Sequence, residues 1–305
     1  MKNVLFATTA LVATAGMAAA EINFSGFARF GVTYVEDRLN GALEDSELNL
    51  EHRLRINIDA STQTDSGVEF GGRFRIEANE SGEDQAQGVI NGARLHAEVG
   101  GFRLEVGNAS HALDNLANFY GFEPGLVGAV GQYNGFQGPV SGFSSTGTGN
   151  NVVSAIYSVG DFRGQIAFDG DSDGAGSDVE TTSVSVAYTF SGWTVALGYE
   201  TADDGNGNDV DGTVLTVGGT IGSVDLAFFL GDDDVGDASY GFSGSFGVGA
   251  ATDILFAVSD GDNVSDASFG VGFNHGLGGD VNLRGMIGQN SSGNTVADLG
   301  VAFNF

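Results

Sequence analysis

The chain of 305 residues contains no cysteine, two prolines and a single lysine. The absence of cysteine excludes a disulfide framework and a thiolate metal site. Proline cannot donate a hydrogen bond within a sheet, so its scarcity favours a chain made mostly of strands. Both prolines, Pro124 and Pro139, fall within one segment, which is therefore expected to be a loop.

Long apolar runs are also missing after residue 20. No stretch approaches the ~18 apolar residues that a transmembrane helix needs, which excludes a helical membrane protein. Basic residues are few, because 11 Lys and Arg stand against 40 Asp and Glu. This acidity argues against nucleic acid as a partner, since phosphate binding requires a basic surface.

The N-terminus has the three parts of a secretory signal peptide. Lys2 is followed by an apolar run over residues 4–15 and by Ala18, Ala19 and Ala20, which form a small-residue cleavage site. The pattern predicts a signal peptide over residues 1–20 and a mature domain over residues 21–305; the alternative is a buried N-terminal helix of the mature fold. Removal of Lys2 leaves ten arginines against forty acidic residues, a net charge of −30.

The mature chain alternates between apolar and polar residues with a period of two. In residues 48–60, Leu54, Ile56 and Ile58 alternate with arginines and other polar residues. Alternating segments of about ten residues are typical of an outer-membrane β-barrel. Sixteen strands are predicted: 22–34, 48–60, 68–78, 89–99, 101–107, 151–159, 161–169, 179–190, 192–201, 210–221, 223–231, 238–248, 250–259, 264–275, 278–288 and 295–305.

A soluble β-sandwich would show the same alternation. Sixteen strands with open edges would invite aggregation, whereas closure into a barrel removes every edge. The connections also alternate between short ones, such as residues 190–193, and long acidic ones, such as residues 169–178. These features favour an all-β, 16-stranded antiparallel transmembrane barrel, which is wide enough for a water-filled channel.

Three stretches carry a family resemblance: EINFSGFARFGVTY at 21–34, TDSGVEFG at 64–71 and VADLGVAFNF at 296–305. They resemble the first strand, the second turn with the third strand, and the closing strand of the general porins of alpha-proteobacteria. The resemblance implies a homotrimer of sixteen-stranded barrels with a third outer loop folded inward as a constriction. It also implies that the termini meet within one strand, so that the α-amine of Glu21 pairs with the carboxylate of Phe305.

The segment 108–150 follows the fifth predicted strand, where the resemblance places the constriction loop. Loops of this length in compact folds usually have a function. Ser110 is predicted to cap a short helix, because Leu113, Leu116, Ala117 and Tyr120 follow helical spacing. Asp114 and Glu123 are its only acidic residues and are the candidates for the acidic side of the pore. The alternative is an outer flap that never enters the lumen.

Arginines are predicted to form the opposite side of the pore. Opposing charged rims create a transverse field that favours hydrated polar solutes. The alternative is that the arginines neutralise Glu51, Glu69, Glu77, Glu98 and Glu105 on the same face, and both interpretations can hold together. By strand parity, seven of the ten mature arginines lie on the polar face of strands one to five: Arg29, Arg53, Arg55, Arg73, Arg75, Arg94 and Arg103.

The acidic loops at residues 169–173 and 203–211 contain enough oxygen ligands for Ca²⁺, although neither fits an EF-hand, and solvated loops are the simpler interpretation. Loop carboxylates bridged by divalent cations to lipopolysaccharide phosphates are a further hypothesis. No other cofactor is expected. The four histidines show no metal-ligand spacing, and no catalytic motif is present, which indicates a protein that is not an enzyme. A hydrolase site assembled in space is the remaining enzymatic alternative.

Together these patterns predict an outer-membrane channel for passive diffusion of small hydrophilic solutes and ions, with weak cation selectivity from the net negative charge. Two alternatives stay open. One is a solute-selective porin, and the other is a secreted or surface Ca²⁺-binding or adhesive β protein.

Overall fold

A computed structural model describes residues 20–40, 43–44, 46–81, 88–170, 180–203 and 208–305. The predicted signal peptide, except Ala20, lies outside this described part. No helix in the described part is long and apolar enough to cross a membrane.

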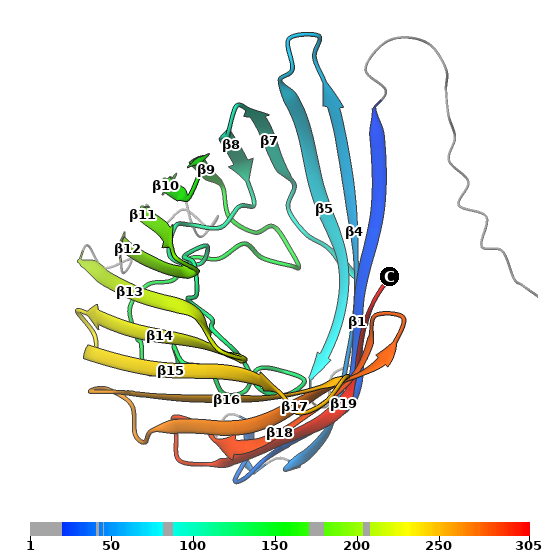
Figure 1. Cartoon of the computed structure of the whole chain (residues 1–305), viewed down its shortest axis with the longest axis vertical. Helices are drawn as coiled ribbons and strands as arrows, with labels where there is room; N and C mark the ends of the chain where they lie inside the picture. Colours follow the sequence, from blue (N-terminus) through cyan, green and yellow to red (C-terminus); the bar gives the residue numbers. More distant parts are fainter. Residues whose placement is uncertain (1–19, 41–42, 45, 82–87, 171–179, 204–207) are drawn as a thin grey trace, which may run out of the picture.

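The chain forms a single ring of antiparallel strands, seen nearly end-on in Figure 1. Three strands have only two residues each. β6 (Val89–Ile90) belongs to the ring, whereas β2 (Leu39–Asn40) and β3 (Leu43–Glu44) pair only with each other. Sixteen longer strands make the wall: β1 (Glu21–Val35), β4 (Leu48–Gln63), β5 (Glu69–Ser81), β7 (Arg94–Val99), β8 (Phe102–Gly107), β9 (Val152–Val159), β10 (Phe162–Asp169), β11 (Thr181–Phe190), β12 (Trp193–Asp203), β13 (Asp209–Ile221), β14 (Val224–Asp233), β15 (Asp237–Gly247), β16 (Thr252–Gly261), β17 (Ser268–Gly278), β18 (Val281–Gln289) and β19 (Thr295–Asn304).

The ring closes because β1 pairs with β4 on one side and with β19 on the other. Arg29 lies opposite Arg53 of β4 and opposite Ala302 of β19, so the first and last strands are continuous in the wall. Each wall strand therefore has a hydrogen-bonded neighbour on both sides, and the sheet has no free edge strand. The predicted sixteen-stranded antiparallel barrel is confirmed.

The period-two pattern separates the two faces of the wall. Ile22, Phe24 and Phe30 of β1 are more than half exposed on the outside, whereas Arg29 faces the interior. The same alternation continues through β11, where Val184 and Val186 are exposed and Ser183 and Ser185 are buried. An apolar outer band with a polar interior is the arrangement of a barrel in a lipid bilayer.

The fourth predicted strand, 89–99, is interrupted in the structure. The regular pairing with β5 stops at Asn91, whose side chain accepts from Arg75 N (2.6 Å) and donates to Ser144 O (2.9 Å). The backbone at Gly92 passes so close to Thr148 that a Cβ there would lie 1.9 Å from the Thr148 carbonyl oxygen. Contact with the segment 108–150 therefore splits this strand into β6 and β7.

The predicted helix after Ser110 is wrong. Residues 112–119 form separate turns, with hydrogen bonds from Leu116 N to Leu113 O (3.0 Å) and from Phe119 N to Leu116 O (3.1 Å). Asn118 has a φ of 61°, a left-handed conformation that ends any helix. The Ser110 hydroxyl accepts from Phe143 N instead of capping a first turn.

The predicted pairing of Glu21 with Phe305 is also wrong. Gly26 N donates to Phe305 O (2.6 Å) and Phe305 N donates to Gly26 O (3.0 Å), so the C-terminus lies five residues away from Glu21. Glu21 pairs with Ser61 of β4, because β1 extends past the end of β19. The ends lie on adjacent strands and not within one.

Candidate functional site

The connection between β8 and β9 lies inside the ring of strands, in green in Figure 1. Inward-facing serines bind its backbone: Ala112 N donates to Ser183 Oγ (2.8 Å), and Gly135 N donates to Ser259 Oγ (2.7 Å). Phe122 N donates to the hydroxyl of Ser243 (2.9 Å). The short polar side chains of the second half of the barrel therefore hold this segment instead of facing open water.

Carboxylates anchor the same segment at three further points. Asp298 accepts from Leu126 N (2.9 Å), Glu200 accepts from Ser141 N (2.7 Å), and Asp233 accepts from Gln137 N (3.1 Å). All three carboxylates are buried. Hydrogen bonds to an ionised group are about twice as strong as neutral ones, so the path of the segment is strongly determined.

Inward-facing glycines give the segment room against the wall. A Cβ on Gly241 of β15 would lie 1.7 Å from the Gln132 carbonyl oxygen, and one on Gly198 of β12 would lie 2.5 Å from a methyl of Leu113. Real side-chain atoms cannot approach so closely, so the missing Cβ atoms are required for the inward fold.

An apolar cluster joins the segment to the wall. Leu113, Leu116 and Phe119 are buried with Val214 of β13 and Phe229 of β14. The rings of Phe119 and Phe229 meet edge to face at 5.3 Å between centroids, a favoured aromatic geometry. The segment therefore has a small core of its own inside the lumen.

A charged recess of about 270 Å³ separates the tip of the segment from the wall. Arg29 reaches across it, donating from Nη1 to Leu126 O (3.2 Å) while its Nη2 lies 2.7 Å from Glu51 Oε1. The lining brings together one predicted acidic residue with three predicted arginines and a fourth that was not predicted: Glu123 with Arg29, Arg53, Arg55 and Arg284.

The two acidic residues of the segment are both hydrogen-bonded to tyrosines. Tyr133 Oη donates to Glu123 Oε1 (2.6 Å), and Tyr120 Oη donates to Asp114. Burial raises the pKa of Glu123, and the hydrogen bond from Tyr133 offsets part of that rise. Asp114 does not line the charged recess, so of the two only Glu123 opposes the arginines.

Most predicted arginines have carboxylate partners, as the neutralisation hypothesis expected. Arg53 and Arg55 both lie within ion-pair distance of Glu77. The other pairs are Arg73 with Asp59 (2.5 Å), Arg94 with Glu105 (3.8 Å), and Arg103 with Glu98 (2.7 Å) and Glu105 (2.8 Å). Glu69 differs, because its partner is His96 at 3.3 Å.

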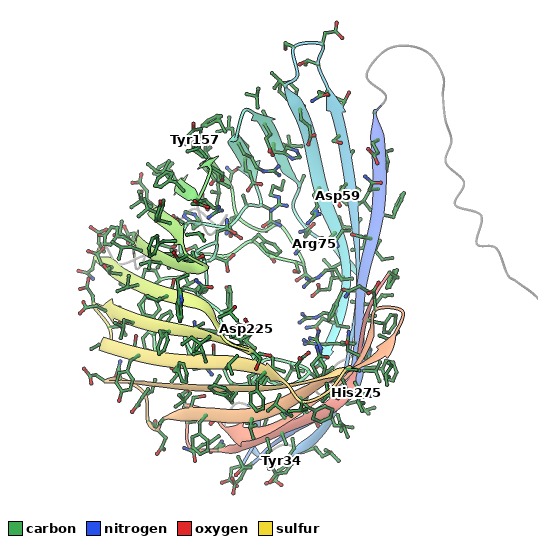
Figure 2. All side chains as sticks on the ribbon, in the orientation of Figure 1. Tyr34, Asp59, Arg75, Tyr157, Asp225 and His275 are labelled. Carbon is green, nitrogen blue, oxygen red and sulfur yellow. The ribbon has the colours of Figure 1, made fainter. Side chains whose placement is uncertain are left out.

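Arg75 contacts the segment directly. Its guanidinium carbon lies 4.2 Å from the centre of the Phe143 ring, and Nη1 donates to Ser145 Oγ (3.3 Å). Figure 2 shows Arg75 on the lumen side of the wall and Tyr157 on the outer side. A guanidinium over an aromatic face is a favourable cation–π contact, so Arg75 holds the segment as well as carrying charge.

Two inward-facing arginines were missed by the sequence analysis. Arg284 of β18 faces Arg29, because closure of the ring brings β18, β19 and β1 together. Within the described part of the chain Arg284 has no hydrogen bond or ion pair, and its Nε is buried. Arg163 of β10 lines a second recess on the wall. The parity argument covered only the first five predicted strands, and only the topology shows the neighbours of these two arginines.

One histidine and one serine meet inside the lumen. His111 Nδ1 lies 3.1 Å from Ser183 Oγ, and both residues are fully buried. The hydroxyl of Ser183 already accepts from Ala112 N, and no solute reaches it. Burial lowers the pKa of His111, which keeps it neutral. This contact serves the anchoring of the segment and provides no accessible nucleophile for a hydrolase.

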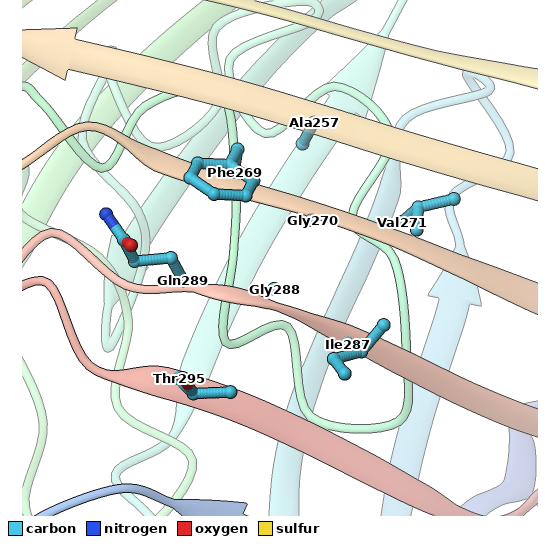
Figure 3. Close-up of a pocket in the computed structure, with 8 residues that line it drawn as sticks. All are labelled: Ala257, Phe269, Gly270, Val271, Ile287, Gly288, Gln289 and Thr295. Carbon is cyan, nitrogen blue, oxygen red and sulfur yellow. The ribbon is translucent and has the colours of Figure 1, made fainter.

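Another hollow of about 460 Å³ lies over β16–β19 (Figure 3). Phe269, Val271 and Ile287 line it, and each is about half exposed on the outside of the barrel. Gly270 and Gly288, which pair across β17 and β18, lie between these outward side chains. It belongs to the lipid-facing surface and not to a solute path.

No group of three or more His, Asp or Glu side chains is close enough to hold a metal ion within the described part of the chain. Much of the acidic stretches proposed for Ca²⁺, at residues 171–173 and 204–207, lies outside the described residues.

Comparisons with known proteins agree with this geometry. Residues 7–295 match the family described as Gram-negative porin. A curated porin from Fuscovulum blasticum is 41% identical over 105 residues, which cover 34% of this chain and 35% of that protein. A solved mutant of Rh. blastica porin is 25% identical, with a TM-score of 0.81 over 93% of this chain and 100% of that one. A triple mutant of Rhodopseudomonas blastica porin has a TM-score of 0.80 at 25% identity over the same shares.

The match to the family covers nearly the whole chain, and the solved porins share its closed ring of strands. The family match confirms the expected location in the outer membrane and the expectation that the protein is a channel and not an enzyme. The chain belongs to the Gram-negative porin family, whose members are β-barrel channels of the outer membrane.

Proposed function

We propose that this porin is a general diffusion channel whose narrowest part lies between the segment 108–150 and the arginines of the wall. The observation that carries the proposal is the charged recess, where Glu123 opposes Arg29, Arg53, Arg55 and Arg284 across about 270 Å³. Fixed charges of opposite sign on facing walls create a transverse field, which favours small hydrated solutes over apolar ones.

The proposed selectivity is a weak preference for cations. The chain is strongly acidic, with a net charge of −29 before removal of the predicted signal peptide, and exposed carboxylates such as Asp232 and Asp234 lie at the long-loop end. A negative mouth raises the local concentration of cations. The arginines oppose this effect inside the lumen, but most of them are paired with glutamates.

The remaining parts of the proposal concern export and assembly. Residues 1–20 act as a signal peptide that is removed during export. The mature barrel assembles as a homotrimer, and its acidic outer loops bind lipopolysaccharide phosphates through divalent cations. The family resemblance of the first and last strands supports the trimer, and the acidity of the loops supports the cation bridge.

Conductance measurements test the channel. The detergent-extracted protein is added to planar bilayers, and single-channel steps and the reversal potential across a KCl gradient are recorded. Ohmic steps that arrive in threes, with a reversal potential of the sign for weak cation preference, are expected. Folded, heat-modifiable protein that gives no steps would contradict an open channel, and a reversal potential of the opposite sign would contradict the selectivity.

A further inference from the structure

A second recess lies on the lumen wall, on the short-turn side of the inward-folded segment. It has a volume of about 430 Å³ and is separate from the charged recess at Glu123. The strand ends at the tight turns after β7 and β9 contribute most of its lining, and Asn115 of the segment covers it. The residues are Arg94, Glu98, Gly101, Arg103, Glu105, Asn115, Ile156, Ser158 and Arg163.

The recess carries one more positive than negative charge. Its two carboxylates, Glu98 and Glu105, are both used by Arg103, at 2.7 and 2.8 Å. Glu105 is also the partner of Arg94, at 3.8 Å. Within the described part of the chain, no carboxylate lies within ion-pair distance of the third guanidinium, that of Arg163.

Neutral groups hold Arg163 in place. Nη1 donates to Asn115 O (3.2 Å), and Nη2 donates to Gln165 Oε1 (3.1 Å). The amide of Gln165 is itself fixed, because its Nε2 donates to Ser110 O and Ser154 Oγ, both at 3.1 Å. Arg163 is thus a preorganised cation with no carboxylate within ion-pair distance, and its nearest charged neighbour, Glu105, is already shared by Arg94 and Arg103.

We propose that this recess is a binding subsite for small solutes that carry a carboxylate or phosphate group, with Arg163 as the anchoring residue. A guanidinium presents several N–H donors in a plane that matches both oxyanions. The hydroxyl of Ser158, opposite Arg163 in the β9–β10 pairing, adds a donor, and Ile156 offers apolar surface to a carbon skeleton. This subsite rests on the proposed channel function and adds a solute class to it.

The position of the recess gives it a role in transport. A solute that passes the narrow part at Glu123 reaches Arg163 before it leaves at the short-turn end. Conduction needs binding that is favourable enough for entry and weak enough for release. A single guanidinium without a carboxylate at ion-pair distance, in a recess on the lumen wall, meets this requirement, so organic anions are not excluded by a channel whose mouth is acidic.

Inorganic phosphate is the probe for the test. Single channels are recorded in about 0.1 M KCl, where charges are screened beyond about 10 Å, while phosphate is added at constant ionic strength. In the wild-type protein we expect a saturable change in conductance. Arg163→Gln is expected to weaken the apparent phosphate affinity by about tenfold or more, because a hydrogen-bonded ionic contact is lost. Arg38→Gln removes the same charge from an arginine outside the recess, one that donates to Thr33 Oγ1, and is expected to stay within about twofold of wild type.

A second variant, Ser158→Glu, tests the subsite independently in case Arg163→Gln does not fold. Ser158 is exposed in the lumen, so Ser158→Glu adds a carboxylate beside Arg163 without creating a buried void. It is expected to abolish the phosphate effect, whereas Ser223→Glu, in a tight turn elsewhere at the same end, leaves it intact. Equal phosphate sensitivity of the wild type, Arg163→Gln and Ser158→Glu would overturn the subsite, as would an equal loss in Arg38→Gln. Open channels that ignore phosphate contradict only the subsite, whereas an absence of channels contradicts the proposed function.

Discussion

Asp298 of the last strand binds the backbone of Leu126, which lies 172 positions away, through a hydrogen bond of 2.9 Å from Leu126 N to Oδ1. The second oxygen of the same carboxylate accepts from Val127 N at 3.2 Å. On the far side of the tip, Arg29 of the first strand donates to Leu126 O. The tip of the inward-folded segment is therefore held where the first and last strands close the barrel.

Replacement of Asp298 by alanine should release this tip. Two hydrogen bonds to a charged acceptor are lost, each worth about 1.5–3 kcal/mol. We expect amide hydrogen exchange at Leu126 and Val127 to become about a hundredfold faster, together with a noisier single-channel current. Asp225→Ala, which removes an exposed carboxylate near a tight turn, serves as the control. Unchanged exchange at the two amides would show that Asp298 does not hold the tip.

The charge on Glu123 should make ion selectivity depend on pH. Burial raises the pKa of Glu123 above its ordinary value, so it gains a proton at a higher pH than exposed glutamates do as the solution is acidified. Its negative charge therefore disappears before that of the exposed glutamates, and the arginines opposite are left unopposed. We expect the ratio of cation to anion permeability to fall by about two- to fivefold in this step. The reason is that one unit charge changes the energy of a passing ion by about 1 kcal/mol or less.

Glu123→Gln is the control for this titration. The variant should start at the lower permeability ratio near neutral pH and should lack the step. Reversal potentials measured at intervals across the acidic range report both values. If the variant titrates as the wild type does, the pH dependence arises from other carboxylates.

Substitution of two arginines of the charged recess should change the stability of the barrel by very different amounts. Arg29→Gln leaves the buried carboxylate of Glu51 without its cation, which is expected to cost about 3–5 kcal/mol. Arg284→Gln removes a cation that has no hydrogen bond or ion pair in the described part of the chain and that lies close to Arg29. Its effect on stability should stay within about 0.5 kcal/mol.

Both variants lose one positive charge, so both should raise cation preference in reversal-potential measurements. Heat modifiability on gels separates their stabilities. Equal loss of stability in the two variants would mean that Arg284 has a structural role that its contacts do not reveal.

A methyl group on Gly241 should displace the segment. The added carbon would lie 1.7 Å from the Gln132 carbonyl oxygen, so either the segment or β15 must move, at a cost of about 1–3 kcal/mol. We expect Gly241→Ala to enlarge the single-channel conductance. Gly247→Ala on the same strand, where the nearest atom to a new Cβ is 3.6 Å away, is the matched control and should conduct as the wild type does.

The strands were predictable because the bilayer and the lumen impose opposite solvents on alternate residues. All sixteen wall strands were found, and most ends agree within two or three residues of the expected ones. The interruption of the strand 89–99 was not predicted, because contact between Gly92 and Thr148 is a tertiary constraint with no local signal. The turns after Ser110 look helical in spacing, but the hydrogen bonds of Ala112 and Phe122 to the wall override that preference.

The site was predictable only in part. Parity assigned seven arginines to the polar face and composition singled out Glu123, since these follow from the alternation of side chains along a strand and from the few charges of one segment. Parity could not say that Arg284 lies beside Arg29, that Asp114 turns to Tyr120, or that buried serines bind the loop backbone.

The sequence alone determined the class of the protein. An acidic, cysteine-free chain in which apolar and polar residues alternate closes into a lipid-facing barrel, because only a closed sheet gives the backbone N–H and C=O groups hydrogen-bond partners within the membrane. The tertiary structure decided the interior. Which charges meet across the lumen depends on ring closure and on the path of one segment, and both join residues more than a hundred positions apart.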